Sequence, residues 1–235
     1  MVFIVPGQQL YSSGEAHQAP YRALDGALKD AGYETHFVDA PGKTIAADAE
    51  LIAEAIRTYA ADATYVGVVA HSAGGLSARY YAKFLGGADK VDNIVSVASL
   101  WKGTLGNEQA SIGRSLRELG VSEAAQAGFP ICKACLNMGA GSEFIENLRA
   151  GGVYAPGVHY TNITTRYDEL VLPYTNGLEP GPNATNIVVQ DGCEQDITDH
   201  LAIAASLRAA TFALNALDPA HQRPVPCNSV LPVVG

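Results

Sequence analysis

Four short strand-like runs in the first 100 residues alternate with segments whose apolar residues recur at helical spacing. The runs cover residues 2–5, 35–39, 65–70 and 91–100. The helical patterns fall between them, over residues 21–31, 45–59 and 76–84. Strands that are separated by helices and are apolar on both faces pair in parallel. This alternation predicts an α/β fold, with a mostly parallel sheet of about six strands and helices on both faces.

The alternation breaks after the fourth run. Residues 101–152 contain two helical patterns, 111–119 and 142–148, with no strand between them. We expect this stretch to be a cap-like insertion over the edge of the sheet, within a single domain of residues 1–235. Beyond the insertion the pattern predicts strands over 158–166 and 186–190, a helix over 201–217 and a proline-rich tail over 218–235.

Size and charge exclude several classes of protein. The 235 residues fit one α/β domain, because such domains often reach about 250 residues. Only 17% of the residues are charged and 48% are hydrophobic, which argues against disorder. The net charge of −9 argues against a nucleic-acid partner. No uncharged apolar run approaches the ~20 residues of a membrane span, so we expect no span. We also expect a monomer.

Residues 70–75, Ala-His-Ser-Ala-Gly-Gly, join a buried strand to an amphipathic helix. A serine on a strained turn between two such elements is the nucleophile elbow of α/β-hydrolases, here with alanine in place of the first glycine. Small residues at 70 and 74 let the strand pack tightly against the helix. The alternative is a serine that only caps the helix. The motif predicts an α/β-hydrolase fold with Ser72 as the nucleophile.

A serine nucleophile needs a base, and chain order selects one. In α/β-hydrolases the acid follows the serine, and the histidine follows the acid. Asp168 comes directly after the strand 158–166, and His200 comes just beyond the strand 186–190. His71 adjoins the nucleophile, and we expect it to be structural, whereas Asp199 has the position of a cap or turn residue. We therefore predict a triad of Ser72, His200 and Asp168.

Hydrolysis of an acyl compound also needs donors for the oxyanion. The backbone N–H of Ala73, at the start of the helix after Ser72, is one candidate. Gly7 follows the first strand and allows close approach of the backbone, which makes the N–H of Gln8 the second candidate. The alternative for residues 6–8 is a plain turn. No set of close-spaced ligands suggests a metal site.

Several separate segments resemble known families. Val-Pro-Gly-Gln at 5–8 and Asp-Glu-Leu-Val at 168–171 look like the lipase B (antarctica-type) family. So do residues 91–94, 102–104, 161–162, 173, 190–193, 199–200, 227–228 and 231–232. The elbow and Ala134-Cys135 look instead like the secreted class 2 lipases of Gram-positive bacteria. His71 stands where lipase B has tryptophan, and Leu100 where it has a pocket aspartate, so substrate selectivity is not carried over.

The resemblance implies a secreted serine carboxylester hydrolase without a cofactor. It would cleave acyl esters such as acylglycerols through an acyl-enzyme on Ser72, with a small-molecule or lipid ester as its partner and contact with a lipid–water interface. The alternatives are a polyesterase of the cutinase kind or an acyltransferase with the same triad, and a catalytically dead scaffold used for binding. The sequence opens in a strand, so for a secreted protein we expect that the signal peptide has been removed. Sequons at Asn162 and Asn183 fit secretion.

The insertion supplies candidate pocket residues. It follows the strand after the elbow, so it should border the carboxyl ends of the strands, where ligands bind in open α/β sheets. We expect apolar side chains to line an acyl pocket there, the alternative being ordinary core. The candidates are Trp101, Leu105, Ile112, Leu116 and Leu119.

Four cysteines, Cys132, Cys135, Cys193 and Cys227, fit disulfides in a secreted chain. Resemblance to the bacterial lipases suggests Cys135 with Cys193, which leaves Cys132 with Cys227. Resemblance to lipase B suggests instead Cys193 with Cys227, which leaves Cys132 with Cys135. We prefer the first arrangement, because its longer loop removes more entropy from the unfolded chain.

Overall fold

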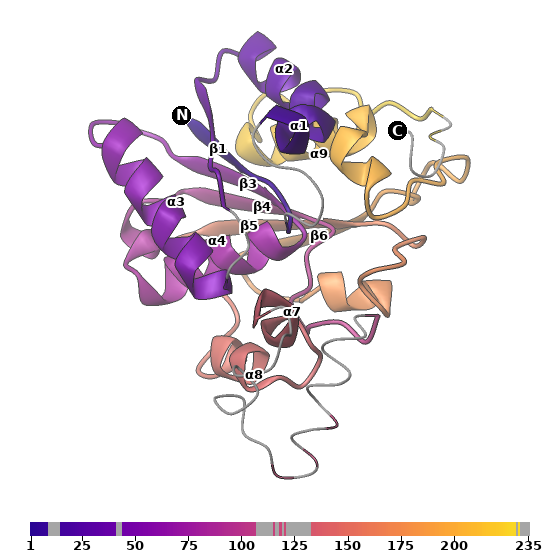
Figure 1. The fold of residues 1–235 in the computed structure, drawn as a ribbon. Helices are drawn as coiled ribbons and strands as arrows, with labels where there is room; N and C mark the ends of the chain where they lie inside the picture. The colour runs from indigo at the N-terminus through magenta and orange to yellow at the C-terminus, as the bar shows by residue number, and fades with distance from the viewer. Residues whose placement is uncertain are drawn as a thin grey trace.

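The computed structural model describes residues 1–8, 15–40, 44–106, 115, 118, 120, 133–228 and 230. A six-stranded sheet lies at the centre of the molecule, in the order β2-β1-β3-β4-β5-β6 (Figure 1). Every neighbouring pair of strands is parallel, which confirms the predicted fold class. The strands are β1 (Val2–Val5), β2 (Thr35–Phe37), β3 (Gly67–His71), β4 (Asn93–Val97), β5 (His159–Thr164) and β6 (Ala184–Val188).

Helices cover both faces of the sheet. The α-helices are α1 (Glu15–Gln18), α2 (Arg22–Asp30), α3 (Ile45–Tyr59), α4 (Ala73–Phe84), α7 (Lys133–Asn137), α8 (Glu143–Arg149) and α9 (Leu207–Leu217). Short 3₁₀ helices are η1 (Ala19–Tyr21), η2 (Gly87–Asp89), η3 (Tyr174–Gly177) and η4 (Ala202–Ala205). Helices α2 and α9 pack together on one face, and α3 and α4 pack together on the other (Figure 1). Among the described residues, no helix combines the length and the apolar character that a membrane crossing requires.

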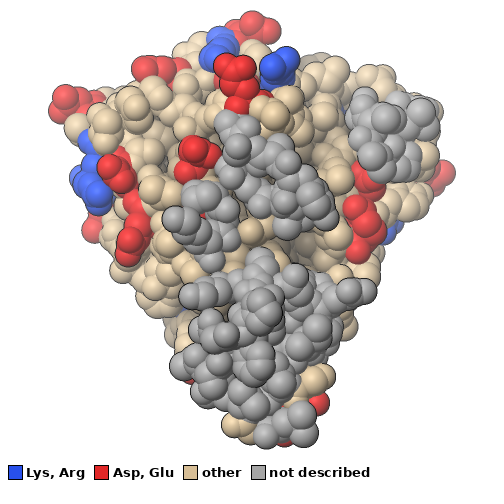
Figure 2. Space-filling model, in the orientation of Figure 1, with Lys and Arg blue, Asp and Glu red and all other residues tan. Residues whose placement is uncertain are grey.

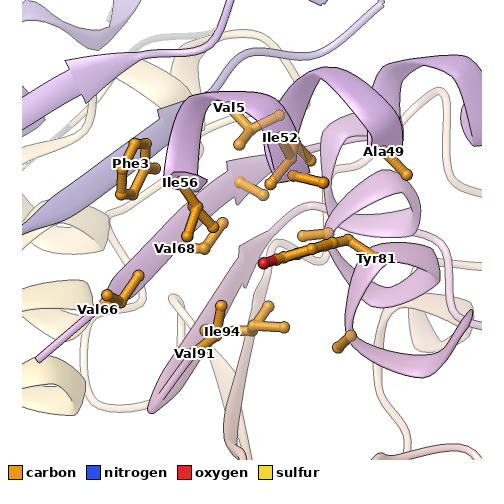
Figure 3. Close-up of a cluster of buried hydrophobic side chains, with 14 of the residues drawn as sticks. Phe3, Val5, Ala49, Ile52, Ile56, Val66, Val68, Tyr81, Val91 and Ile94 are labelled. Atoms are coloured by element: carbon orange, nitrogen blue, oxygen red, sulfur yellow. The ribbon is translucent and has the colours of Figure 1, made fainter. Parts of the chain in front are cut away.

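Alternate residues of each strand fill two separate cores, as buried parallel strands should. Phe3 and Val68 point toward α3 and α4, where they pack against Ile52, Ile56 and other apolar side chains (Figure 3). Residues one position along the strands, such as Ile4 and Val69, belong to the core under α2 and α9. Each fully buried side chain of this size contributes about 1.5–3 kcal/mol to folding.

The described part of the insertion is fastened to α4. Arg79 is fully buried (0% exposed) and donates hydrogen bonds to the backbone carbonyls of Val153 (2.9 Å), Leu148 (2.8 Å) and Trp101 (3.4 Å). One turn later, the Lys83 ammonium donates to three carbonyls at the end of α8 and just beyond it. Leu148 lies in the last turn of α8, where carbonyls have no partner within the helix, so these two cations satisfy a group that would otherwise be left unpaired.

Several predicted elements are shorter than the sequence pattern indicated, and two differ by five residues or more. The fourth strand ends at Val97 rather than at residue 100, because Ala98 takes a positive φ of 46° that leaves the sheet. The last helix begins at Leu207 rather than at 201, because the Ser206 side chain caps it by accepting the N–H of Ala209 (3.3 Å). The helix predicted over 111–119 lies almost entirely outside the described residues.

The preferred disulfide pairing is wrong. Cys193 is bonded to Cys227, with their Cα atoms 5.4 Å apart, which excludes both Cys135–Cys193 and Cys132–Cys227. The guanidinium of Arg208 donates to the carbonyls of Asp191 and Pro226 and so brings the two segments together. Loop-closure entropy depends only weakly on loop length, about 0.6 kcal/mol per doubling, so proximity in the fold decides the pairing. Cys135 is also disulfide-bonded, and Cys132 lies outside the described residues.

Candidate active site

Ser72 occupies a strained turn between the end of β3 and the start of α4. Its backbone has φ 53° and ψ −125°, a conformation that costs a residue with a side chain about 1–3 kcal/mol. Two hydrogen bonds of 2.9 Å hold it there, from the Ser72 N–H to the Val97 carbonyl and from the Ser99 hydroxyl to the Ser72 carbonyl. A Cβ at Gly74 would lie 2.6 Å from the carbonyl oxygen of Pro6. Only glycine at 74 therefore allows the helix to approach β1 this closely.

The structure brings the three predicted triad residues together. The Ser72 hydroxyl does not cap α4, although it has the N-cap position. Its Oγ instead lies 2.9 Å from His200 Nε2, and His200 Nδ1 lies 2.9 Å from both carboxylate oxygens of Asp168. A carboxylate only accepts, so Nδ1 donates its proton and Nε2 is left to accept one from the serine. This arrangement can activate the hydroxyl as a nucleophile.

The Asp168 carboxylate is buried and held by its own loop. Its Oδ1 accepts backbone N–H bonds from Leu170 (3.0 Å) and Val171 (2.7 Å) in addition to the imidazole. These partners offset the cost of burying the carboxylate. The loop follows β5 directly, which is the position that chain order predicts for the acid.

Further polar contacts, which sequence reasoning missed, join the acid loop to the histidine loop. The His200 N–H donates to the Glu169 carboxylate (3.1 Å). The Thr165 hydroxyl donates to the Thr198 carbonyl and accepts from the Gln190 side chain. None of these residues has a local sequence signature, since each contact joins segments more than 20 residues apart.

His71 is buried behind the triad, in keeping with the structural role expected for it. Its ring nitrogens lie 2.9 Å from the Tyr21 hydroxyl and 3.0 Å from the backbone carbonyl of His200. Burial, with a smaller contribution from the nearby His200, lowers the pKa of His71 to about 3. His71 is therefore neutral at ordinary pH, and of the two histidines only His200 contacts the Ser72 hydroxyl.

The candidate oxyanion residues lie on either side of the nucleophile. Ala73 is the first residue of α4, where backbone N–H groups have no partner within the helix. A Cβ on Gly7 would lie 3.1 Å from Ser72 Cβ, so residues 6–8 run directly against the nucleophile. The Gly7 N–H donates to the Tyr21 hydroxyl (2.9 Å) and is committed there. Gln8 follows and is half-buried.

The candidate pocket residues fall into three groups. The assignment of Trp101 to a pocket is wrong, since its ring is fully buried (0% exposed) in the core against Tyr154 and Tyr160. Leu105 is 54% exposed, and its N–H donates to the Leu172 carbonyl (2.9 Å) beside the acid loop. The remaining candidates, Ile112, Leu116 and Leu119, lie outside the described residues. Across the part of the chain that the structure describes, no three histidine, cysteine, aspartate or glutamate side chains gather as a metal site requires.

Comparison with known protein families gives a match to a lipase family. The model of the class 2 lipase family matches residues 49–209, which is more than half of the chain. No curated protein sequence matches the chain.

Solved structures share the fold at low identity. Aspergillus fumigatus lipase B superposes with a TM-score of 0.73 at 21% identity, over 96% of this chain and 53% of its own. The chain thus spans about half the length of that lipase. The mature Bacillus licheniformis lipase BlEst2 gives a TM-score of 0.63 at 16% identity, over 91% of this chain and 89% of its own. A lin2722 gene product from Listeria innocua gives 0.56 at 13% identity, over 95% and 96%.

Proposed function

This chain belongs to the class 2 lipase family, and on that premise we propose that it is a secreted serine carboxylester hydrolase acting on acyl esters such as acylglycerols. The observation that carries the proposal is the pair of short contacts on His200, 2.9 Å from the Ser72 hydroxyl and 2.9 Å from the Asp168 carboxylate. The resulting arrangement is that of the serine hydrolases.

In the proposed reaction, Ser72 Oγ attacks the acyl carbonyl carbon while its proton passes to His200 Nε2. Asp168 accepts the Nδ1–H bond throughout and stabilises the positive imidazolium that forms. His200 then gives the proton to the departing alcohol oxygen, and the C–O bond of the ester breaks to leave an acyl-enzyme on Ser72. A water molecule, deprotonated by His200, then attacks the acyl carbon. The bond between that carbon and Ser72 Oγ breaks, His200 returns the proton to Ser72 Oγ, and the acid is released.

We assign the two oxyanion donors to the backbone N–H groups of Ala73 and Gln8. Ala73 begins α4, so the positive end of the helix dipole adds to its N–H. Residues 6–8 lie against Ser72, and the Gly7 N–H cannot serve because it is bonded to Tyr21. Losing one such donor costs about 10²–10³-fold in kcat in other hydrolases.

Exposed leucines beside the triad support a lipid-like substrate. Leu201, next to His200, is 53% exposed, and Leu170 and Leu172 on the acid loop are each 40% exposed. Leu105 joins them, because Leu105 pairs with Leu172 and Thr104 with Leu170 through hydrogen bonds. Apolar side chains that gather around a catalytic site mark a surface for an apolar ligand. We propose that these leucines contact the acyl chains or the surface of a lipid aggregate.

Secretion of a monomer is part of the proposal. The Cys193–Cys227 disulfide fits an oxidising compartment. The sequon at Asn162 does not support secretion, since its side chain is fully buried and donates to Tyr154 and Asn186. On the face shown in Figure 2, acidic side chains are more prominent than basic ones over the described surface, as the net charge of −9 leads one to expect. Such a surface repels polyanions.

The deciding experiment compares Ser72→Ala with Ser206→Ala. Both serines have N-cap positions, but only Ser206 caps its helix. Ser72→Ala should keep its stability and lose hydrolysis of p-nitrophenyl esters, and fluorophosphonate labelling, by several orders of magnitude. Ser206→Ala should lose about 1 kcal/mol of stability and keep its activity. Wild-type turnover in Ser72→Ala would overturn the assignment. Rates on esters of increasing chain length and on emulsified triglyceride then define the substrate.

A further inference from the structure

A chain of hydrogen bonds runs behind the proposed triad, from the loop after β1 to the backbone of the catalytic histidine. The Gly7 N–H lies 2.9 Å from the Tyr21 hydroxyl. That hydroxyl lies 2.9 Å from His71 Nδ1, and His71 Nε2 lies 3.0 Å from the His200 carbonyl. All of these side-chain groups are buried. These hydrogen bonds connect residues 7 and 21 with residues 71 and 200, which are far apart in the sequence.

The donor and the acceptor of every hydrogen bond in this series follow from its two end groups, the Gly7 N–H and the His200 carbonyl. A backbone carbonyl only accepts, so His71 Nε2 must carry the proton that is donated to His200. In a neutral imidazole Nδ1 is then bare and accepts the proton of the Tyr21 hydroxyl. The Tyr21 oxygen in turn accepts the N–H of Gly7. All the protons therefore point from the loop after β1 toward His200.

We propose that Tyr21 and His71 are positioning residues, which hold the oxyanion loop and the base in one fixed geometry through this directed chain. The inference rests on the proposed function, because that proposal assigns Gln8 as an oxyanion donor and His200 as the base. At one end, fixing the Gly7 N–H orients the peptide that precedes the Gln8 donor. At the other end, the His200 backbone is held by His71 at its carbonyl and by Glu169 at its N–H.

This chain of hydrogen bonds keeps its direction only while the Tyr21 and His71 side chains are neutral. Burial lowers the pKa of His71 to about 3 and raises that of Tyr21 to about 12. A protonated His71 would turn a second N–H toward Tyr21 and remove the acceptor that the tyrosine proton needs. The two titratable side chains that act on His71 through their charge, His200 and His17, both lower its pKa and so favour the neutral form. The hydrogen-bond chain therefore stays intact at neutral pH.

A kinetic comparison of two buried tyrosines tests the proposal. Tyr21 and Tyr160 each use their hydroxyl to accept one backbone N–H, but Tyr160 lies in the core on the other face and accepts from Ala155. We expect Tyr21→Phe to lower kcat by about 10- to 100-fold with little change in KM, as small misplacement of catalytic groups does. Tyr160→Phe should lower thermal stability to a similar degree and leave kcat unchanged. Equal kcat losses in the two variants, or an unchanged kcat in Tyr21→Phe, would overturn the proposal.

Substitutions at His71 separate a positioning role from simple packing. Gln can present an amide N–H to the His200 carbonyl, whereas Leu fills the space without a donor. We expect His71→Gln to retain a higher kcat than His71→Leu. Equal kcat values in two folded variants would show that the donor is irrelevant and would contradict the inference.

A third measurement uses the wild-type protein and does not depend on catalysis. The ¹⁵N shifts of the His71 ring should show a proton on Nε2 and none on Nδ1 from pH 5 to pH 8. A proton on Nδ1, or a charged ring near pH 6, would refute the directed chain even if every variant at 71 failed to fold. If Ser72→Ala remained active, the proposed function would fail while this spectroscopic result could still stand.

Discussion

The disulfide between Cys193 and Cys227 should contribute a large share of the stability of this chain. The two cysteines are 34 residues apart. In the loop-closure model, removing a bridge of that span costs about 3.8 kcal/mol at 25 °C through the entropy that the unfolded chain regains. For a chain of 235 residues, the unfolding entropy is about 0.5 kcal/mol/K, so the melting temperature should fall by about 8 °C. The double variant Cys193→Ala/Cys227→Ala, followed by calorimetry and urea unfolding, measures both quantities.

The same variant should leave catalysis nearly unchanged at 25 °C. His200 is held by Asp168, Glu169 and His71, none of which depends on the bridge. Adding a reductant to the variant provides the control, because any further loss then belongs to the bond that includes Cys135. A stability loss below about 1 kcal/mol would refute the entropic argument. A large loss of kcat would show that the bridge, rather than these hydrogen bonds, positions the base.

Three further predictions follow from the site. Asp168→Asn should lower kcat by about 10⁴-fold. Asp199→Asn should stay within about tenfold, because an amide oxygen can still accept the N–H groups of Leu201 and Ala202. The reverse ranking in ester hydrolysis would show that Asp168 is not the acid. Gly74→Ala should destabilise by about 1–3 kcal/mol and lower kcat, since its Cβ would meet the carbonyls of Pro6 and Val5 at 2.6 and 2.8 Å. The matched change Gly26→Ala has open space in α2 and should stabilise by about 0.5–1 kcal/mol. Between pH 6.5 and about 3 the unfolded chain binds a proton at His71 that the folded chain does not. The free energy of unfolding should therefore fall on acidification by up to about 1.4 kcal/mol per pH unit. Urea unfolding at several pH values should show a smaller dependence of this free energy on pH in His71→Gln than in the wild type.

Local patterns were sufficient to predict the sheet and the order of the site residues. Each strand and helix is encoded by periodicity within a short window, and parallel pairing follows from their alternation. Ser72, Asp168 and His200 could be chosen because each follows a strand, and the ends of parallel strands meet at one edge of a sheet. These choices needed no knowledge of side-chain contacts.

Features that depend on contacts between distant segments were not predictable. The apolar run at 91–100 gives no sign that Ala98 takes a positive φ of 46°, at which the strand ends. The sequence does not show whether an apolar residue of the insertion, such as Trp101, lines a pocket or packs in the core. The role of Tyr21 depends on partners 14 and 50 residues away. For Ser206, by contrast, a signal was present, since serine is a preferred cap.

Arg79 determines how freely segments of this chain can be exchanged. Its charge persists at neutral pH, since burial and Arg149 lower its pKa only to about 10. All three of its acceptors are carbonyls of the 101–153 stretch. Replacing that stretch with one that lacks matching carbonyls would leave the donors of a buried cation unpaired, and each unpaired buried donor costs about 1–3 kcal/mol or more. The insertion is therefore not a detachable module, and a graft succeeds only when its carbonyls reach the same guanidinium or when residue 79 is changed with it.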